Sequence, residues 1–198
     1  MGASGLKSGC CLSLGRIDCS IMSDSRPIPL LPASTSEPAE LVASILKRRE
    51  GSGLLKLDRM LLHSPPLCEG WNAFFGKVRG SLSLAPRVKE LIMCAVAVMT
   101  RAHYQYEHHA PLYVAAGASA EQAKALEDID QPHFQTHLFS EEEADVISLA
   151  RAMTRDIVVP AALKRRMVQR HGAQAVVEAI AVAASYNMVS RFLVRVVT

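Results

Sequence analysis

Two ionisable side chains, Glu90 and His109, stand where neighbouring helices can bring them together for proton transfer. Glu90 lies in an apolar run with Leu91, Ile92 and Cys94, where a carboxylate is costly unless it is paired. A histidine on the adjoining helix is its most plausible partner. A carboxylate that orients an imidazole and sets its tautomer produces a general acid or base. The same pair also fits a packing contact between two helices, so the residues alone leave both interpretations open.

Helix signals run through the chain from about residue 38 and predict an all-α protein. Apolar residues recur at helical spacing, proline occupies the first turn of several helices, and glycines end others. Capping boxes begin two helices, at Ser119 and at Ser140. Pro111 is expected to kink or split its helix. The predicted helices cover residues 38–49, 54–63, 64–80, 83–99, 102–116, a short one from 119, 140–154, 160–171 and 173–197, with a loop over 129–139.

The last predicted helix is apolar on more than one face. Val176, Ile180, Val189 and Leu193 are spread around it rather than along one stripe. A helix that is apolar nearly all round is buried on all sides. In a chain of 198 residues this predicts a partner subunit, and therefore a homo-oligomer.

Charge, hydropathy and cysteine content exclude several classes of protein. The net charge is only +3 and no Lys/Arg run exceeds three residues, which disfavours a nucleic-acid partner. No uncharged apolar stretch is long enough for a membrane span. The five cysteines are odd in number and lack a C-x-x-C motif, which disfavours a disulfide scaffold or a cysteine zinc site. We therefore expect a cytoplasmic, reducing location.

Metal binding is also disfavoured by the arrangement of the histidines. Only His103 and Glu107 share a helix face near the candidate pair, so a solvated or paired face is the favoured interpretation and no metal is expected. His133 and His137 stand four apart in a predicted loop, where histidines are mostly exposed. There is no Gly-rich phosphate loop and no G-x-S-x-G motif. The sequence thus predicts neither a metal nor a cofactor.

The first 25 residues differ from the rest of the chain. They are rich in Gly, Ser and Cys, show no periodicity, and lack the continuous apolar segment of a signal peptide. We expect residues 1–25 to form a flexible leader, or an extension upstream of a start at Met22. A helical domain is predicted over residues 26–198.

Several motifs resemble the carboxymuconolactone decarboxylase and alkylhydroperoxidase D (AhpD-like) superfamily. The resemblance covers roughly residues 27–197 and implies an all-α bundle with a central helical hairpin, assembled as a trimer or hexamer. The motifs are Arg87-Val-Lys-Glu90-Leu-Ile, the segment from Ala102 to His109, Ala115-Ala-Gly117-Ala-Ser119, Leu61-Leu-His63-Ser-Pro65 with Gly70-Trp71, and Tyr186-Asn187-Met-Val-Ser-Arg191-Phe192.

The redox branch of this superfamily carries a C-x-x-C pair between its glutamate and its histidine. In this chain Glu90 and His109 match, but the two cysteine positions are Ala102 and Gln105. A peroxidase of this type needs one thiolate to attack the peroxide and a second thiol to resolve the product. Cys94 is alone and is predicted to be buried and inert. The AhpD-type peroxidase is therefore the disfavoured alternative.

The decarboxylase branch lacks the cysteines and resembles this chain in its histidine. The resemblance implies a lyase for a small carboxylated lactone, or a related enolisable acid, of the kind met in aromatic-compound catabolism. It gives catalytic roles to Glu90 and His109, with a small molecule as the partner. A non-catalytic helical oligomer with a vestigial pocket remains a further alternative. The candidate substrate-binding residues are Tyr104, Gln105, Tyr106, Arg101, Asn187 and Arg191.

Overall fold

The central element of the fold is α4 (Pro86–Met99), which packs against α5 (His103–Ala115), α7 (Glu141–Arg155) and α8 (Ala161–Val196). Every side chain from Leu91 to Ala97 in α4 is buried, so this helix lies in the core. α4 and α5 run next to each other as the predicted helical hairpin. This hairpin carries Glu90 on one arm and His109 on the other.

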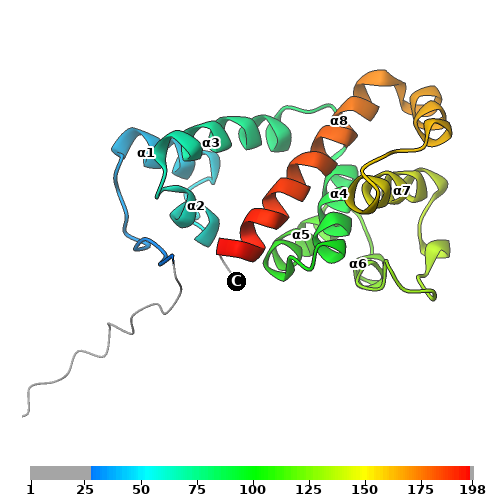
Figure 1. Cartoon of the computed structure of the whole chain (residues 1–198), viewed down its shortest axis with the longest axis horizontal. Coiled ribbons are helices and arrows are strands. Elements are labelled where there is room, and N and C mark those ends of the chain that lie inside the picture. Colours follow the sequence, from blue (N-terminus) through cyan, green and yellow to red (C-terminus); the bar gives the residue numbers. More distant parts are fainter. Residues whose placement is uncertain (1–27, 197–198) are drawn as a thin grey trace, which may run out of the picture.

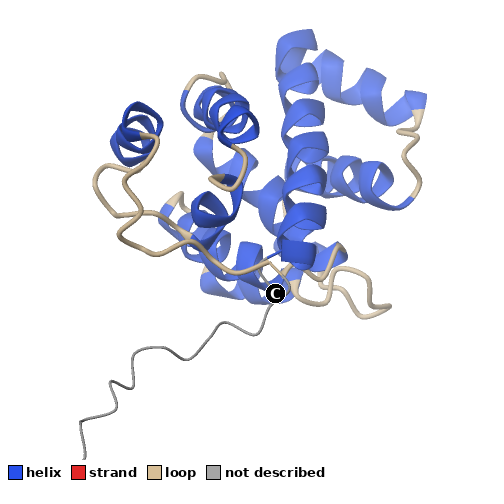
Figure 2. Cartoon of the chain, turned by 60° about the vertical axis from the view of Figure 1, so that its left-hand side comes forward, coloured by secondary structure: helices blue, strands red, loops and turns tan. Residues whose placement is uncertain are grey.

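The computed structural model describes residues 28–196, and every regular element in that range is a helix (Figure 2). The predicted all-α class is therefore confirmed. The leader predicted over 1–25 lies outside the described residues. The remaining elements are α1 (Ala39–Arg48), α2 (Lys56–Leu61), α3 (Pro65–Gly80), α6 (Ala120–Leu126) and the short 3-10 helix η1 (Thr136–Leu138).

Several helices start at the residues where local sequence signals predict their N-termini. The Gln122 amide donates to Ser119 Oγ at 3.0 Å, and the Glu143 amide donates to Ser140 Oγ at 3.2 Å. Both predicted capping boxes are thus present. Proline stands in the first turn of α3 and of α4, where its missing N–H costs no helical hydrogen bond.

The prediction that Pro111 splits its helix is wrong. α5 runs from His103 to Ala115 without a break. Proline removes the hydrogen bond to the carbonyl four residues earlier, which here belongs to Glu107. Both Pro111 and Glu107 are exposed, so water can satisfy that carbonyl and the helix continues.

α8 consists of two helical segments that meet at Gly172. This residue has φ +80° and ψ 164°, a conformation that side chains other than glycine rarely adopt. The predicted separation at Gly172 is therefore confirmed. By length and composition α8 could cross a membrane, but 56% of its most apolar window is buried inside the protein, as in an ordinary core helix.

The helices α1, α2 and α3 lie on one side of α8, and α4 to α7 lie mainly on the other (Figure 1). Aromatic contacts attach α3 to α8: the rings of Trp71 and Phe192 are 5.3 Å apart, and those of Phe75 and Tyr186 are 5.9 Å apart. This packing brings the three early helices over the face of α5 that carries His109. The candidate site forms at that junction.

Candidate active site

His109 and Glu90 form a close, nearly buried pair between α5 and α4. The distance from His109 Nδ1 to Glu90 Oε2 is 2.6 Å. Only 7% of the histidine side chain and 13% of the glutamate side chain are exposed. The hydrogen bond fixes one ring nitrogen of His109, so it also fixes the orientation of the other.

Burial lowers the pKa of His109, and the carboxylate of Glu90 opposes that shift only in part. The imidazole is therefore neutral at pH 7. Because a carboxylate oxygen is an acceptor, Nδ1 carries the ring proton and donates it to Glu90. Nε2 then presents a lone pair, and it makes no hydrogen bond within the described part of the chain. A neutral ring held in this tautomer is a general base.

A small cavity of about 70 Å³ opens beside His109. It lies where α1 to α3 meet α5 and α8, so its walls come from both sides of α8. The edge of the His109 ring stands against the face of Tyr186, with ring centroids 5.1 Å apart and planes at 83°. The lining residues are Arg48, Arg49, Leu55, Leu57, Trp71, Phe75, Arg79, Tyr104, Gln105, His108, His109, Tyr186, Val189 and Leu193.

Three arginines in this lining were not predicted as site residues. Arg48 and Arg49 are largely buried, since their side chains are only 19% and 12% exposed. Arg49 makes two hydrogen bonds to the buried Asp58, of 2.6 and 2.8 Å, and Arg48 Nη2 lies 3.6 Å from the same carboxylate. The sequence around Arg48 and Arg49 gives no local signal of this contact, because Asp58 on α2 comes close to them only when the chain folds. The third arginine is Arg79, on α3.

Of the six predicted substrate-binding residues, Tyr104 and Gln105 line the cavity. Gln105 is 2% exposed, and both ends of its amide are occupied. Its nitrogen donates to the Met93 carbonyl at 3.0 Å, and its oxygen accepts from Ser190 Oγ at 2.8 Å. Gln105 therefore joins α4, α5 and α8 around the cavity rather than offering a polar atom to a ligand.

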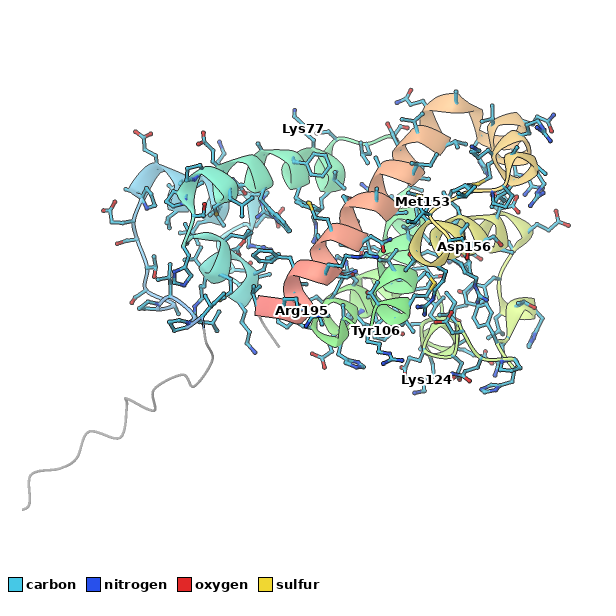
Figure 3. The ribbon with its side chains drawn as sticks, in the orientation of Figure 1. Lys77, Tyr106, Lys124, Met153, Asp156 and Arg195 are labelled. Atoms are coloured by element: carbon cyan, nitrogen blue, oxygen red, sulfur yellow. The ribbon has the colours of Figure 1, made fainter. Side chains whose placement is uncertain are left out.

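The other four predicted residues lie outside this cavity. Tyr106, labelled in Figure 3, lies on α5 and donates to the carbonyl of Ala123 on α6. Arg101 is exposed in the turn before α5. Asn187 donates to Thr154 Oγ1 at 2.9 Å, and Arg191 donates to the Asn187 side chain at 2.6 Å. The helical periods of α5 and α8 turn Tyr106, Asn187 and Arg191 away from His109.

A second, larger hollow of about 640 Å³ lies at the N-terminal ends of α4 and α7, against α8. It contains neither member of the Glu90–His109 pair. Its central cation is already engaged, because Arg87 donates to Glu143 at 2.9 Å and to Gln122 at 3.1 Å. We therefore assign the candidate chemistry to the smaller cavity. Within residues 28–196, no three His, Cys, Asp or Glu side chains gather in a way that would hold a metal ion.

The two cysteines within the described range are poor nucleophiles. Cys68 is 1% exposed and Cys94 is fully buried. Burial raises the pKa of Cys68 to about 11, and burial together with the nearby Glu90 also raises the pKa of Cys94. Thiolates at neutral pH are therefore scarce at both positions.

We expect Cys94 to resist alkylation in the folded protein. Treatment with iodoacetamide at pH 8, followed by peptide mass spectrometry, should leave Cys94 unmodified in buffer and modify it in 6 M guanidinium chloride. Peptides without cysteine in the same digest provide the reference for signal intensity. Rapid labelling of Cys94 in the native protein would restore the peroxidase alternative.

The fold and the site together define an all-helical protein with a buried histidine–glutamate pair at one wall of a cationic cavity. The family model described as "Carboxymuconolactone decarboxylase family" matches residues 65–136, which include both members of the pair. This match agrees with the resemblance that the motifs indicated, and the matched segment carries Ala102 and Gln105 at the positions of the C-x-x-C cysteines.

Structural comparison agrees with this fold. One similar crystal structure is that of an uncharacterized peroxidase-related protein from Silicibacter sp. TM1040, with a TM-score of 0.71 and 15% sequence identity. The match covers 89% of this chain and 94% of that protein. At this identity the likeness shows the fold alone. No curated protein matches the sequence significantly.

Proposed function

We propose that this protein is an acid–base enzyme, of the decarboxylase type rather than the peroxidase type, that acts on a small carboxylated lactone or a related enolisable acid. The observation that supports it most strongly is the 2.6 Å contact from His109 Nδ1 to Glu90, which leaves Nε2 without a hydrogen bond in a ring that lines the cavity. Glu90 orients the ring, and His109 exchanges the proton.

The site suits two related reactions. In enolisation, Nε2 removes a proton from carbon, and the electron pair of the broken C–H bond forms the enolate. In decarboxylation, the bond to the carboxylate carbon breaks, carbon dioxide leaves, and the electron pair stays on the substrate as an enolate. In enolisation the ring returns the Nε2 proton to carbon, whereas in decarboxylation Nε2 first takes a proton from solvent and then donates it to carbon. Glu90 stabilises the positive charge that the ring carries in both reactions.

Thiol chemistry has less support in this cavity. Ala102 and Gln105 occupy the positions of the C-x-x-C cysteines, and the amide of Gln105 is tied to two helices. Cys94 is buried in α4 and does not line the cavity. Neither step of a dithiol peroxidase cycle has a residue to perform it within the described chain.

We also propose that the protein works as a homo-oligomer, a trimer or a hexamer. Large apolar side chains on α8 support this, since Val177 is 65% exposed and Met188 is 46% exposed in the single chain. Light scattering coupled to size-exclusion chromatography should give three or six times the chain mass of 21.5 kDa. A mass equal to one chain would contradict this part of the proposal.

The test of the function measures two products. Carbon dioxide release from 4-carboxymuconolactone and deuterium uptake from D₂O by enolisable acids should both be followed, in the native protein and in His109→Gln. His103→Gln is the matched control, because His103 is exposed on the same helix and does not line the cavity. We expect the native protein and the control to turn over at least one of these substrates, and His109→Gln to lose that activity. Full activity in His109→Gln would overturn the proposal.

A further inference from the structure

We propose that Arg79 and Tyr186 form the oxyanion-binding part of the cavity, and that the substrate is a small 2-oxo acid of three or four carbons. This inference rests on the proposed acid–base function and specifies its substrate class. Arg79 binds the carboxylate, Tyr186 donates to the carbonyl oxygen, and His109 Nε2 meets the carbon next to that carbonyl.

Arg79 is the cavity arginine that is left to bind an anion. Arg48 and Arg49 both contact the carboxylate of Asp58. Arg79 has no carboxylate partner within residues 28–196; its guanidinium lies within reach of the Tyr186 hydroxyl. Arg79 is also exposed while lining the cavity, so it stands at the mouth. A guanidinium placed there binds a carboxylate through two parallel hydrogen bonds.

Tyr186 supplies a neutral donor next to that cation. Its side chain is 3% exposed and packs against His109. Burial raises the pKa of Tyr186 to about 12, so the phenol keeps its proton at neutral pH. A buried O–H in contact with a cation stabilises an oxygen that gains negative charge, which is the requirement of an enolate.

The volume of the cavity limits the size of the ligand. Its 70 Å³ is about half of the ~150 Å³ in which a benzene ring binds. Trp71, Phe75 and Leu193 provide apolar walls that suit a methyl or methylene group. A molecule of about six non-hydrogen atoms, with its charged end at Arg79, fills this space, and a 2-oxo acid of three carbons has that size.

The chemistry balances without an oxidant or a reductant. His109 Nε2 takes a proton from C3 of the 2-oxo acid. The electron pair of the C3–H bond forms the C2=C3 double bond, and the carbonyl oxygen takes the negative charge and accepts a hydrogen bond from Tyr186. After the ring exchanges its proton with solvent, the reverse steps place a solvent-derived hydrogen on C3.

The experiment measures binding and exchange separately, with pyruvate as the probe. Isothermal titration gives affinity, and proton NMR in D₂O gives the rate at which the pyruvate methyl signal is lost. Variants Arg79→Gln and Tyr186→Phe are compared with Lys77→Gln, an exposed cation two residues away on α3 that is not part of the cavity (Figure 3).

We expect Arg79→Gln to weaken binding by about 10- to 100-fold, the effect of losing a charged hydrogen-bond pair. Tyr186→Phe should slow exchange by about 10²-fold or more while pyruvate still binds. Lys77→Gln should match the native protein in both measurements. This pattern supports the inference.

Other outcomes separate the two proposals. Binding that depends on Arg79 without exchange in the native protein supports the carboxylate site and overturns the acid–base function. Turnover of the larger lactone that Arg79→Gln leaves unchanged supports the function and overturns this inference. Absence of pyruvate binding at 10 mM in the native protein also overturns this inference.

Discussion

Replacing Glu90 by glutamine is expected to slow turnover by about 10²- to 10⁴-fold, because the orienting carboxylate sets the tautomer on which the base depends. In the native protein Nδ1–H donates to Glu90 at 2.6 Å. The glutamine amide can instead donate to Nδ1, which places the ring proton on Nε2. A ring in that tautomer cannot remove a proton from a molecule in the cavity.

The pH dependence of the rate gives a second measure of the effect of Glu90→Gln. Burial lowers the pKa of His109, so the acid limb of the native rate profile should lie below pH 6.5, the ordinary histidine value. The rate falls on that limb because protonation removes the base. Glu90 opposes the effect of burial, so without its charge the limb of Glu90→Gln should lie at still lower pH.

The measurement is kcat/KM against pH for the first substrate identified, with circular dichroism to check the fold. Glu107→Gln is the matched control, since Glu107 is an exposed carboxylate on the same helix as His109. We expect it to behave like the native protein. A Glu90→Gln variant with native rate and native pH profile would show that the pair is a packing contact.

Replacing Asp58 by alanine is expected to lower the free energy of unfolding by about 3–5 kcal/mol, the usual cost of removing one partner from a buried ionic cluster. Asp58 is 2% exposed and accepts the Leu55 amide at the start of α2, at 2.8 Å. It also pairs with Arg49 at 2.6 Å and lies 3.6 Å from Arg48. Its loss would leave two shielded guanidinium groups with no other carboxylate partner among residues 28–196.

Urea unfolding of Asp58→Ala and Asp130→Ala tests this prediction. Asp130 pairs with Arg155 at the surface, where its side chain is 36% exposed, and exposed pairs contribute only about 0–1 kcal/mol. We expect Asp58→Ala to lower the free energy of unfolding by at least 2 kcal/mol more than Asp130→Ala, because Asp58 is the more buried residue. Equal, small losses would mean that the Arg48–Arg49–Asp58 cluster does not hold α1 and α2 together.

The α4–α5 part of the site was predictable from the sequence because its signals are local. A carboxylate in an apolar helix needs a partner, and the next helix offered His109 within twenty residues. The starts of several helices were predictable from capping residues and first-turn prolines, because these signals are also local. Pro111 was misjudged because its effect depends on whether water reaches the carbonyl of Glu107, which only the packing decides.

The cationic half of the cavity could not be predicted in this way. Arg48 and Arg79 come from α1 and α3, which meet His109 only after α3 packs against α8 through Trp71 and Phe75 and α1 packs against α3. The spacing of Lys47-Arg48-Arg49 is that of an ordinary exposed helix end. Asn187 and Arg191 were predicted as substrate-binding residues, but the period of α8 directs them toward α7 and each other.

The most direct test of the account is the state of the His109 ring, which needs no substrate. Side-chain ¹⁵N and ¹H NMR between pH 5 and 8, assigned by comparison with His109→Gln, reports both the tautomer and the pKa. We predict a neutral ring protonated at Nδ1, with a pKa below 6.5. A ring protonated at Nε2, or an imidazolium at pH 7, would contradict the assignment of His109 as the base.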